Sequence, residues 1–237
     1  MSHLKVVRLV AVLAAVSVLG ACAKSDAKPA PQQGSSSGDV AKPPVPAGGL
    51  KDSTSTLADH NRTKGSDKAP IWLIEISDFQ CPYCKQWHDE SYEKINREFV
   101  QTGKVRLAYV NYPIPSLHPN ARAASEAAMC ASVQGKFWEL HEALFINQAR
   151  WAKLPDPKPV FDSMAVAAGV NAAAWRSCIE SHATLPLIDA DRDKSERVGV
   201  QSTPTFFVGS VKLEGAYPVD SFRTVINAEL LKAKTPK

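Results

Sequence analysis

Two cysteines, Cys81 and Cys84, are the residues of this 237-residue chain best suited to do chemistry. They follow an apolar, β-branched run at 71–76 and open a helical pattern that continues to about residue 101. Cysteines spaced i, i+3 at a helix start face the same side and can close a disulfide without backbone movement. Pro82 suits the first helical turn. The helix dipole would stabilise a thiolate at Cys81 and lower its pKa, so the pattern predicts a redox site.

One carboxylate, Glu75, interrupts the apolar run six residues before Cys81. A buried carboxylate without a partner is costly, and burial raises its pKa. A protonated Glu75 could then exchange a proton with Cys84 during the reaction. The alternative is a glutamate at the end of the strand whose side chain reaches solvent.

Zinc binding is the competing chemistry for the same motif. Cys81, Cys84 and His88 follow the spacing i, i+3, i+7, which is one face of a helix. A closed structural zinc site needs four ligands, and no second cysteine or histidine pair has a spacing that would complete it. We therefore expect no metal and no other cofactor, and interpret His88 as a surface histidine of the helix. His118 and His141 are likewise interpreted as structural.

Residues 1–21 have the pattern of a targeting segment. Two basic residues precede an apolar stretch at 9–19 that is too short to span a bilayer. Residues 19–22, Leu-Gly-Ala-Cys, resemble a bacterial lipobox. Cleavage before Cys22 would leave this residue lipidated and the protein anchored to the lipid bilayer. The alternative is an ordinary signal peptide, with Cys22 removed or left free.

After the lipidation motif, residues 22–56 are rich in proline, glycine and serine. Such a segment buries too little apolar surface to offset the entropy of ordering it, so we expect a disordered tether. The folded domain is then expected at 57–237. The net charge of +4 is modest and much of the excess lies before this domain, so we expect no nucleic-acid partner.

Periodicity within 57–237 predicts a block of helices between two groups of strands. Strands at 71–76 and 105–110 enclose one helix, which predicts a right-handed parallel βαβ unit. The later elements are helices at about 120–133, 136–147 and 160–168, a helix capped by Asn171, a helix at 185–198, strands at 205–208 and 211–214, and a terminal helix at 219–233.

With these elements in place, residues 57–237 resemble the DsbA-like branch of the thioredoxin superfamily. The matching stretches are 78–84 (Asp-Phe-Gln-Cys-Pro-Tyr-Cys), 134–138 (Gln-Gly-Lys-Phe-Trp) and 199–208 (Gly-Val-Gln-Ser-Thr-Pro-Thr-Phe-Phe-Val), in family order. The resemblance implies an α/β thioredoxin fold, a central mixed sheet flanked by helices, with a helical insertion at about 115–198.

The resemblance also implies roles for individual residues. Cys81 matches the exposed nucleophilic cysteine and Cys84 its buried partner, while Glu75 matches an acid at the corresponding family position. Thr203 and Pro204 match the loop whose proline is cis and faces the disulfide. Such a loop exposes the backbone of residue 203 to an incoming peptide. The alternative for Pro204 is an ordinary turn proline.

Two further cysteines remain once Cys22 is set aside. Cys130 and Cys178 each lie near the end of a predicted helix in the insertion, and an even number of cysteines is typical of an oxidising compartment. We predict a structural disulfide between them. The alternative is two buried thiols on separate helices, too far apart to be bridged.

The activity implied by the resemblance is thiol:disulfide oxidoreduction on reduced, exported proteins at the periplasmic side of the bacterial cell envelope. We expect a monomeric oxidase that is recycled by a membrane protein of the DsbB type. Strong oxidants of the family typically carry Pro-His between the cysteines, whereas this chain has Pro82-Tyr83. A disulfide isomerase or reductase therefore stays open, as does a client-binding chaperone lipoprotein in which the disulfide is only a staple.

Overall fold

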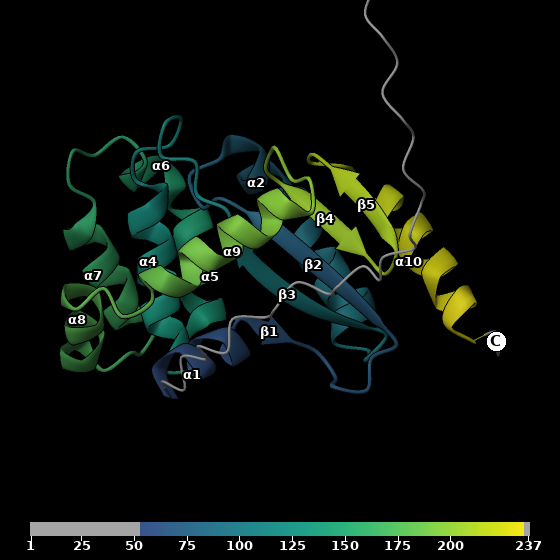
Figure 1. Ribbon diagram of the computed structural model, residues 1–237, viewed down its shortest axis with the longest axis horizontal. Helices are drawn as coiled ribbons and strands as arrows, with labels where there is room; N and C mark the ends of the chain where they lie inside the picture. The colour runs from purple at the N-terminus through teal and green to yellow at the C-terminus, as the bar shows by residue number, and fades with distance from the viewer. Residues whose placement is uncertain (1–52, 235–237) are drawn as a thin grey trace, which may run out of the picture. The chain divides into compact units, whose positions relative to one another are not determined.

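The structure, a computed structural model, describes residues 53–234, with side chains from residue 55. Its centre is a five-stranded mixed sheet in the order β1-β3-β2-β4-β5, in which only β2 and β3 are parallel (Figure 1). The strands are β1 (Thr63–Lys64), β2 (Ile71–Ser77), β3 (Val105–Asn111), β4 (Thr205–Val208) and β5 (Val211–Glu214). The predicted signal peptide, Cys22 and the tether up to residue 52 lie outside the described residues.

A long helical segment connects β2 to β3 and completes the predicted parallel βαβ unit. It runs without a break through α2 (Pro82–Trp87), a π-helical turn η1 (His88–Tyr92), α3 (Glu93–Ile95) and a second π-helical turn η2 (Asn96–Val100). The two strands pair in register from Ile71 opposite Val105 to Ser77 opposite Asn111. The start of the helix is thereby placed beside the C-terminal ends of both strands.

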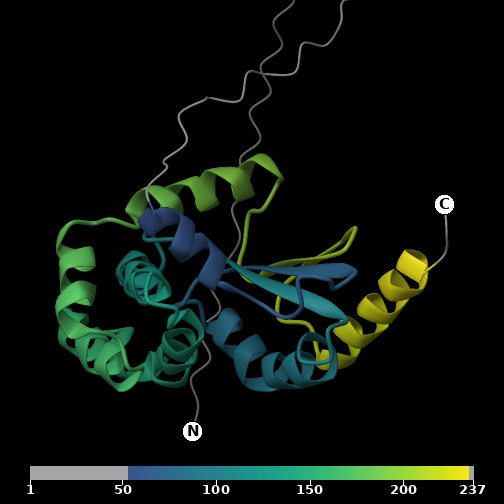
Figure 2. The ribbon, with the colours of Figure 1, turned by 90° about the horizontal axis from the view of Figure 1, so that it is seen from below.

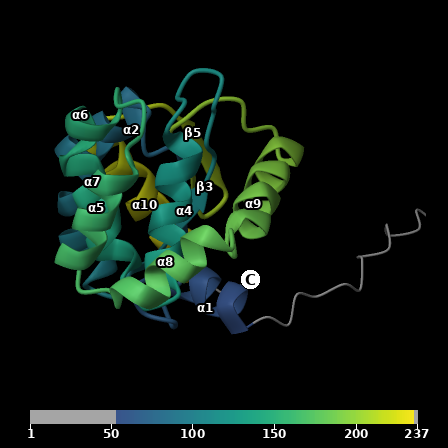
Figure 3. The same cartoon turned by 90° about the vertical axis from the view of Figure 1, so that its left-hand side faces the viewer.

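The helical insertion lies between β3 and β4, as expected (Figure 1 and Figure 3). Its helices are α4 (Ala121–Ser132), α5 (Phe137–Ile146), α6 (Gln148–Trp151), α7 (Lys158–Ala167), α8 (Ala172–Glu180) and α9 (Leu185–Arg197). Asn171 caps α8 by accepting a hydrogen bond of 3.0 Å from the backbone N–H of Ala174. The short α6 was not predicted.

The two faces of the sheet are covered by different helices (Figure 2). Alternation along β2 sends Ile71, Leu73 and Glu75 to the face that the α2–η2 helix and α10 (Val219–Lys234) cover. On the opposite face Ile76 is buried and Ile74 half-buried, and α9 lies on this side (Figure 2). Glu75 therefore points toward the helix that begins at Cys81.

The segment before β2 contains two elements that were not predicted. It contains helix α1 (Ser53–Asn61) and strand β1, so regular structure begins four residues before the expected domain start. Helix α1 packs on α4, where Ser132 Oγ donates to the carbonyl of Ala58 (2.7 Å) and Asn61 Nδ2 donates to the carbonyl of Ser132 (2.8 Å). These long-range contacts, rather than a strong apolar periodicity, hold α1 in place.

A buried ion pair ties this N-terminal segment to α9. The guanidinium of Arg62 donates to both carboxylate oxygens of Asp191, at 2.9 Å for Nη2 to Oδ1, and also pairs with Asp59. Asp191 in turn accepts hydrogen bonds from the backbone N–H and the side-chain amide of Asn111, at 3.1 and 3.0 Å. One carboxylate thus connects α9 to the end of β3.

Within residues 53–234, no helix combines the length and the apolar character that a membrane span requires.

Candidate active site

Cys81 is the N-cap residue of α2, and both Cys81 and Cys84 are free thiols in the structure. The extended backbone of Cys81 (φ −65°, ψ 127°) and Pro82 at the first helical position begin the helix at the motif. The resemblance implied an exposed nucleophile, but only 3% of Cys81 is accessible. Two residues from distant segments contact Cys81: the carbonyl of Thr203 lies 3.4 Å from its sulfur, and Gln148 Nε2 donates to its carbonyl at 3.1 Å.

The surroundings of Cys81 favour its thiolate. A hydrogen bond from the Cys84 thiol lowers the pKa of Cys81 to about 6, against the opposing effect of burial. The side chain of Thr203 and the backbone N–H groups of Cys84 and Tyr83 lower the pKa further. Donors at the start of a helix therefore stabilise negative charge on this sulfur.

Cys84 has the opposite preference. It is fully buried, and burial raises the pKa of its thiol well above the ordinary value, with the neighbouring Cys81 adding to the effect. The backbone N–H of Asp78 lies 3.5 Å from its sulfur and lowers the pKa by a smaller amount. The reduced site is thus polarised, with the charge on Cys81 and the proton on Cys84.

The loop before β4 completes the site from a distant part of the chain. The peptide bond between Thr203 and Pro204 is cis, and the sulfur of Cys81 lies 3.4 Å from the carbonyl oxygen of Thr203. Strand β4 pairs with β2, with Thr205 opposite Ile76, so this loop meets the end of β2 where the motif begins. The structure therefore brings Thr203 and Cys81 together, as the resemblance implied.

Glu75 lies beneath the motif and is fully buried. Its register partners are Tyr109 on β3 and Phe206 on β4. Neither carboxylate oxygen has a hydrogen-bond partner among the described residues. Burial raises the pKa of Glu75 to about 8, although Ser77 and Lys64 oppose the shift. The side chain therefore holds a proton at neutral pH, and the alternative of a solvent-exposed glutamate is wrong.

Two histidines, His88 and His141, are buried where α5 packs on the α2–η2 helix. His88 was interpreted as a surface residue, but it is buried because α5 packs over it: its ring stacks on Phe145 with 4.9 Å between centroids. His141 is fully buried, 5.3 Å from the ring of Tyr109, and burial lowers the pKa of both histidines. Across residues 53–234, no three or more His, Cys, Asp or Glu side chains are grouped so that they could hold a metal ion.

One pair of residues near the cysteines, Asp78 and His118, was not predicted from the sequence. The buried carboxylate of Asp78 accepts hydrogen bonds from the backbone N–H of Gln80 (2.7 Å) and Ile114 (2.9 Å), and its Oδ2 lies 2.8 Å from Nδ1 of His118. The carbonyl of Asp78 accepts from the backbone N–H of Cys81 at 3.1 Å. Asp78 and His118 are 40 positions apart, so no local spacing indicated the pair.

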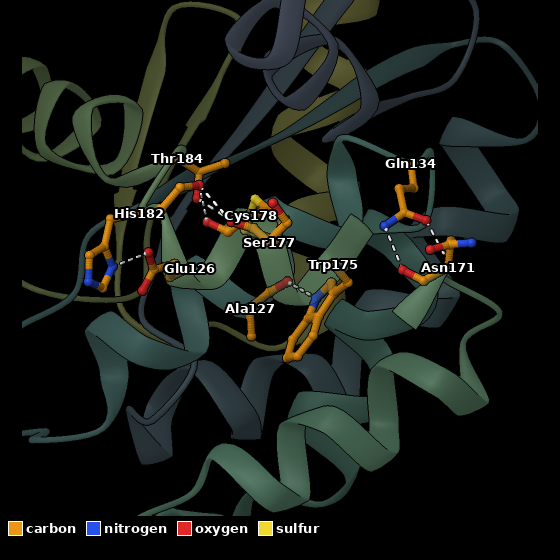
Figure 4. The surroundings of a disulfide bond; sticks show 11 residues. Glu126, Ala127, Gln134, Asn171, Trp175, Ser177, Cys178, His182 and Thr184 are labelled. Carbon is orange, nitrogen blue, oxygen red and sulfur yellow. Dashed lines mark hydrogen bonds and ion pairs between the residues drawn. A yellow bond between two sulfur atoms is a disulfide. The ribbon is translucent and has the colours of Figure 1, made fainter. Parts of the chain in front are cut away.

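Cys130 and Cys178 form a disulfide that joins α4 to α8 within the insertion, which is the pairing expected from the sequence. Figure 4 shows the hydrogen bonds that surround it: Trp175 Nε1 donates to the carbonyl of Ala127 at 3.3 Å, and His182 pairs with Glu126 at 2.8 Å. The bridge therefore lies in a region where α4 and the α8–α9 segment are also held together by polar contacts.

The chain is similar to known proteins both in sequence and in structure. A family model described as thioredoxin matches residues 58–228. The Na(+)/H(+) antiporter NhaA 3 of Salinispora tropica is 28% identical over 178 residues, which is 74% of this chain but only 26% of the antiporter. The Disulfide bond formation protein D of Bacillus subtilis is 23% identical over 170 residues, 70% of this chain and 75% of that protein. This chain thus spans about a quarter of the length of its antiporter relative.

Solved structures show the same fold. BdbD from Bacillus subtilis in its oxidised form superposes with a TM-score of 0.66 and 23% identity, covering 72% of this chain and 92% of BdbD. The alpha-DsbA1 protein of Wolbachia pipientis gives a TM-score of 0.65 and 23% identity, covering 73% and 92%. The helical insertion gives the chain the DsbA-like form of the thioredoxin fold. Since the thioredoxin family model matches residues 58–228, which are most of the described residues, the chain belongs to the thioredoxin family.

Proposed function

We propose that the protein is a thiol:disulfide oxidoreductase that donates the Cys81–Cys84 disulfide to reduced, exported proteins. The observation that supports this most directly is the opposite shift of the two thiols: the pKa of Cys81 is lowered to about 6, while that of Cys84 is raised. A dithiol polarised in this way is stable when reduced, and a stable reduced form makes the oxidised form a good oxidant.

The reaction proceeds through a mixed disulfide. A substrate thiolate attacks the sulfur of Cys81, the Cys81–Cys84 bond breaks, and Cys84 leaves and takes up a proton. A second substrate thiolate then attacks the substrate sulfur of the mixed disulfide, and Cys81 leaves as a thiolate. The substrate loses two electrons and forms its disulfide, and the enzyme gains the two electrons.

Glu75 can supply the proton that Cys84 needs. Its carboxyl group is protonated at neutral pH, and it shares its surroundings with Cys84, since Ser77 lowers the pKa of both groups. Transfer from a buried carboxylic acid avoids the formation of a buried thiolate, which the burial of Cys84 strongly disfavours. Glu75 thus serves as an acid in the first step and as a base when the enzyme is reoxidised.

The experiment that tests the proposal is thiol oxidation of a reduced model protein by wild-type protein and by Cys81→Ser. We expect Cys81→Ser to abolish oxidation, and unchanged oxidation would overturn the proposal. The direction of the reaction is measured separately by equilibration with glutathione. A potential near about −120 mV supports an oxidase, whereas one near about −270 mV favours the reductase alternative. Reshuffling of a scrambled substrate at an intermediate potential would favour an isomerase.

A client-binding chaperone is the second candidate, and one surface feature favours it. A cleft of about 450 Å³ lies on the sheet face beside α9, and its lining includes Ile74, Val110, Val198 and Phe207. Suppression of client aggregation that is equal in wild-type protein and Cys81→Ser, without any thiol oxidation by either, would support this candidate over the enzyme.

Location and partners belong to the same proposal. Lipidation of Cys22 would anchor the domain through residues 22–56 at the periplasmic side of a bacterial membrane, where a DsbB-type membrane protein could reoxidise it. We expect a monomer with no cofactor besides its cysteine pair. Cys22→Ala should abolish incorporation of labelled fatty acid and release the protein from the membrane fraction. Unchanged labelling would disprove lipidation at this residue.

A further inference from the structure

We propose that His118, held by the buried carboxylate of Asp78, is the cationic positioning residue that stabilises the Cys81 thiolate. This inference rests on the proposed function, because it concerns the same sulfur. His118 lies in the loop between β3 and α4, so this loop would supply a positive charge that the cysteine motif itself lacks.

The geometry begins with Asp78, which contacts both cysteines through its backbone. Its carbonyl accepts from the N–H of Cys81 at 3.1 Å, and its own N–H lies 3.5 Å from the sulfur of Cys84. Its carboxylate is fully buried and lies 2.8 Å from Nδ1 of His118. His118 is therefore held by Asp78, whose backbone contacts both Cys81 and Cys84.

Charge balance explains what His118 does there. A carboxylate beside a thiolate disfavours the thiolate by repulsion, and in a buried place the repulsion is weakly screened. The imidazolium of His118 neutralises Asp78 and leaves Cys81 free to carry negative charge. The side chain of His118 is 15% exposed, so bulk water cannot replace this compensation fully.

The electrostatics of His118 agree with this arrangement. The hydrogen bond to Asp78 raises the pKa of His118, burial opposes the rise, and the charges of Asp78 and Cys81 raise it further. The charged or titratable groups that act on the imidazole are thus Asp78 in the β2–α2 loop and Cys81 at the start of α2. Both favour the imidazolium, and by reciprocity the imidazolium favours the Cys81 thiolate.

The consequence for the reaction lies in its second step. When the substrate disulfide forms, the bond between Cys81 and the substrate breaks, and its electron pair stays on Cys81. The imidazolium stabilises the charge that develops on this leaving sulfur. The proton of His118 is not transferred in this step, so no further reactant is needed.

The test compares His118→Asn with His182→Asn. Each change replaces a histidine paired with a carboxylate at 2.8 Å, but the partner of His182 is Glu126 in the insertion. His182 has a positive φ of 53°, a conformation that asparagine tolerates. We expect His118→Asn to raise the pKa of Cys81 by about one unit, which lowers its thiolate fraction near pH 6 from about one half to about one tenth. His182→Asn should leave the pKa unchanged.

A second measurement follows the imidazole itself. Titration of the histidine ring signals by NMR should show a higher pKa for His118 in the reduced protein than in the oxidised protein, because only the reduced form carries the Cys81 thiolate. The ring signals of His182, the control residue in the insertion, should not differ between the two forms. Equal pKa values of His118 in the two redox states would overturn the proposal, even if the protein stays folded.

Failure of this inference is distinguishable from failure of the proposed function. If Cys81→Ser abolishes thiol oxidation but His118→Asn leaves the Cys81 pKa and the glutathione equilibrium unchanged, the enzyme stands and His118 is only structural. The double variant Asp78→Asn with His118→Asn removes both charges, so its Cys81 pKa should lie closer to the wild-type value than to that of His118→Asn. A double variant that is no different from His118→Asn alone would contradict the charge-balance argument.

Discussion

The sulfur of Cys81 lies 3.4 Å from the carbonyl oxygen of Thr203, although the two residues are 122 positions apart. The same carbonyl is the backbone acceptor that an extended substrate peptide would use in strand-like pairing. Because this carbonyl lies against the sulfur, a substrate that pairs with the Thr203 backbone is held beside the reactive atom. Recognition of the peptide and access to the reactive atom are thereby combined at one residue.

The hydrogen bond from Cys84 is expected to control the Cys81 thiolate, because it is the largest influence on the Cys81 pKa. Cys84→Ala removes the donor and should raise the Cys81 pKa by about one unit or more. Cys84→Ser keeps a hydroxyl donor and should raise the pKa less. Ultraviolet absorbance of the thiolate across a pH titration measures both. Equal pKa values in the two variants would show that the hydrogen bond is not responsible.

Buried Glu75 should make the stability of the oxidised protein depend on pH. Its pKa is raised to about 8, so ionisation favours the unfolded chain once the pH exceeds the ordinary carboxyl pKa. Glu75→Gln removes this effect, and near pH 8 it should be more stable than wild type by roughly 2–4 kcal/mol. The difference should shrink toward about pH 4, where the carboxyl is protonated in both states. Chemical denaturation at several pH values measures it, and a difference that does not vary with pH would contradict a protonated Glu75.

The same substitution should slow the reaction. Glutamine cannot donate a carboxylic proton to Cys84, so formation of the mixed disulfide should be slower in Glu75→Gln, by roughly 10²-fold for the loss of a general acid. Stopped-flow measurement with a reduced peptide follows this step directly. An unchanged rate would mean that Cys84 receives its proton from another group.

The disulfide of the insertion is expected to contribute to stability but not to catalysis. It closes a loop with a sequence separation of 48. Replacing both Cys130 and Cys178 by alanine should cost about 4 kcal/mol in the chain-entropy model. Denaturant unfolding measures this cost, and the potential of the Cys81–Cys84 pair in the same variant serves as the control. A large change in that potential would show that the insertion is coupled to the redox site.

Asp191 and Asp189 on α9 offer a matched comparison of buried and exposed ion pairs. The Asp191 side chain is 3% exposed and pairs with buried Arg62, whereas Asp189 is 51% exposed and pairs with Arg122. Asp191→Asn leaves Arg62 with only its contact to Asp59, so we expect a loss of roughly 3–5 kcal/mol. Asp189→Asn should cost roughly 1 kcal/mol or less. Thermal unfolding of the two variants checks the contrast, and similar costs would contradict it.

Much of the redox site could be predicted because its parts are local. The spacing of Cys81 and Cys84, the proline between them and the strand before them all lie within about a dozen residues, and short-range rules govern such segments. The parallel pairing of β2 and β3 followed from the same local reasoning, since one helix connects them. The burial of Glu75 followed from its place in an apolar strand.

Other features depend on contacts that no local pattern records. Strand β1 has only two residues, and α1 is held by bonds to Ser132, so neither had a clear sequence signal. His88 lies on a helix whose spacing allowed a surface position, yet the aromatic side chains of α5 bury it. Packing between distant elements decided each case.

By itself, the sequence determined the spacing of Cys81 and Cys84 at a helix start and the burial of Glu75 in the preceding strand, because helix geometry and strand alternation act over a few residues. Only the tertiary structure decided what surrounds the sulfur: the Thr203 carbonyl that covers it and the Asp78–His118 pair beside it. Thr203 is 122 positions from Cys81 and His118 is 40 positions from Asp78, so the distances between these groups depend on how the sheet and the insertion pack. The electrostatics of a thiolate depend on such distances, which is why its pKa required the fold.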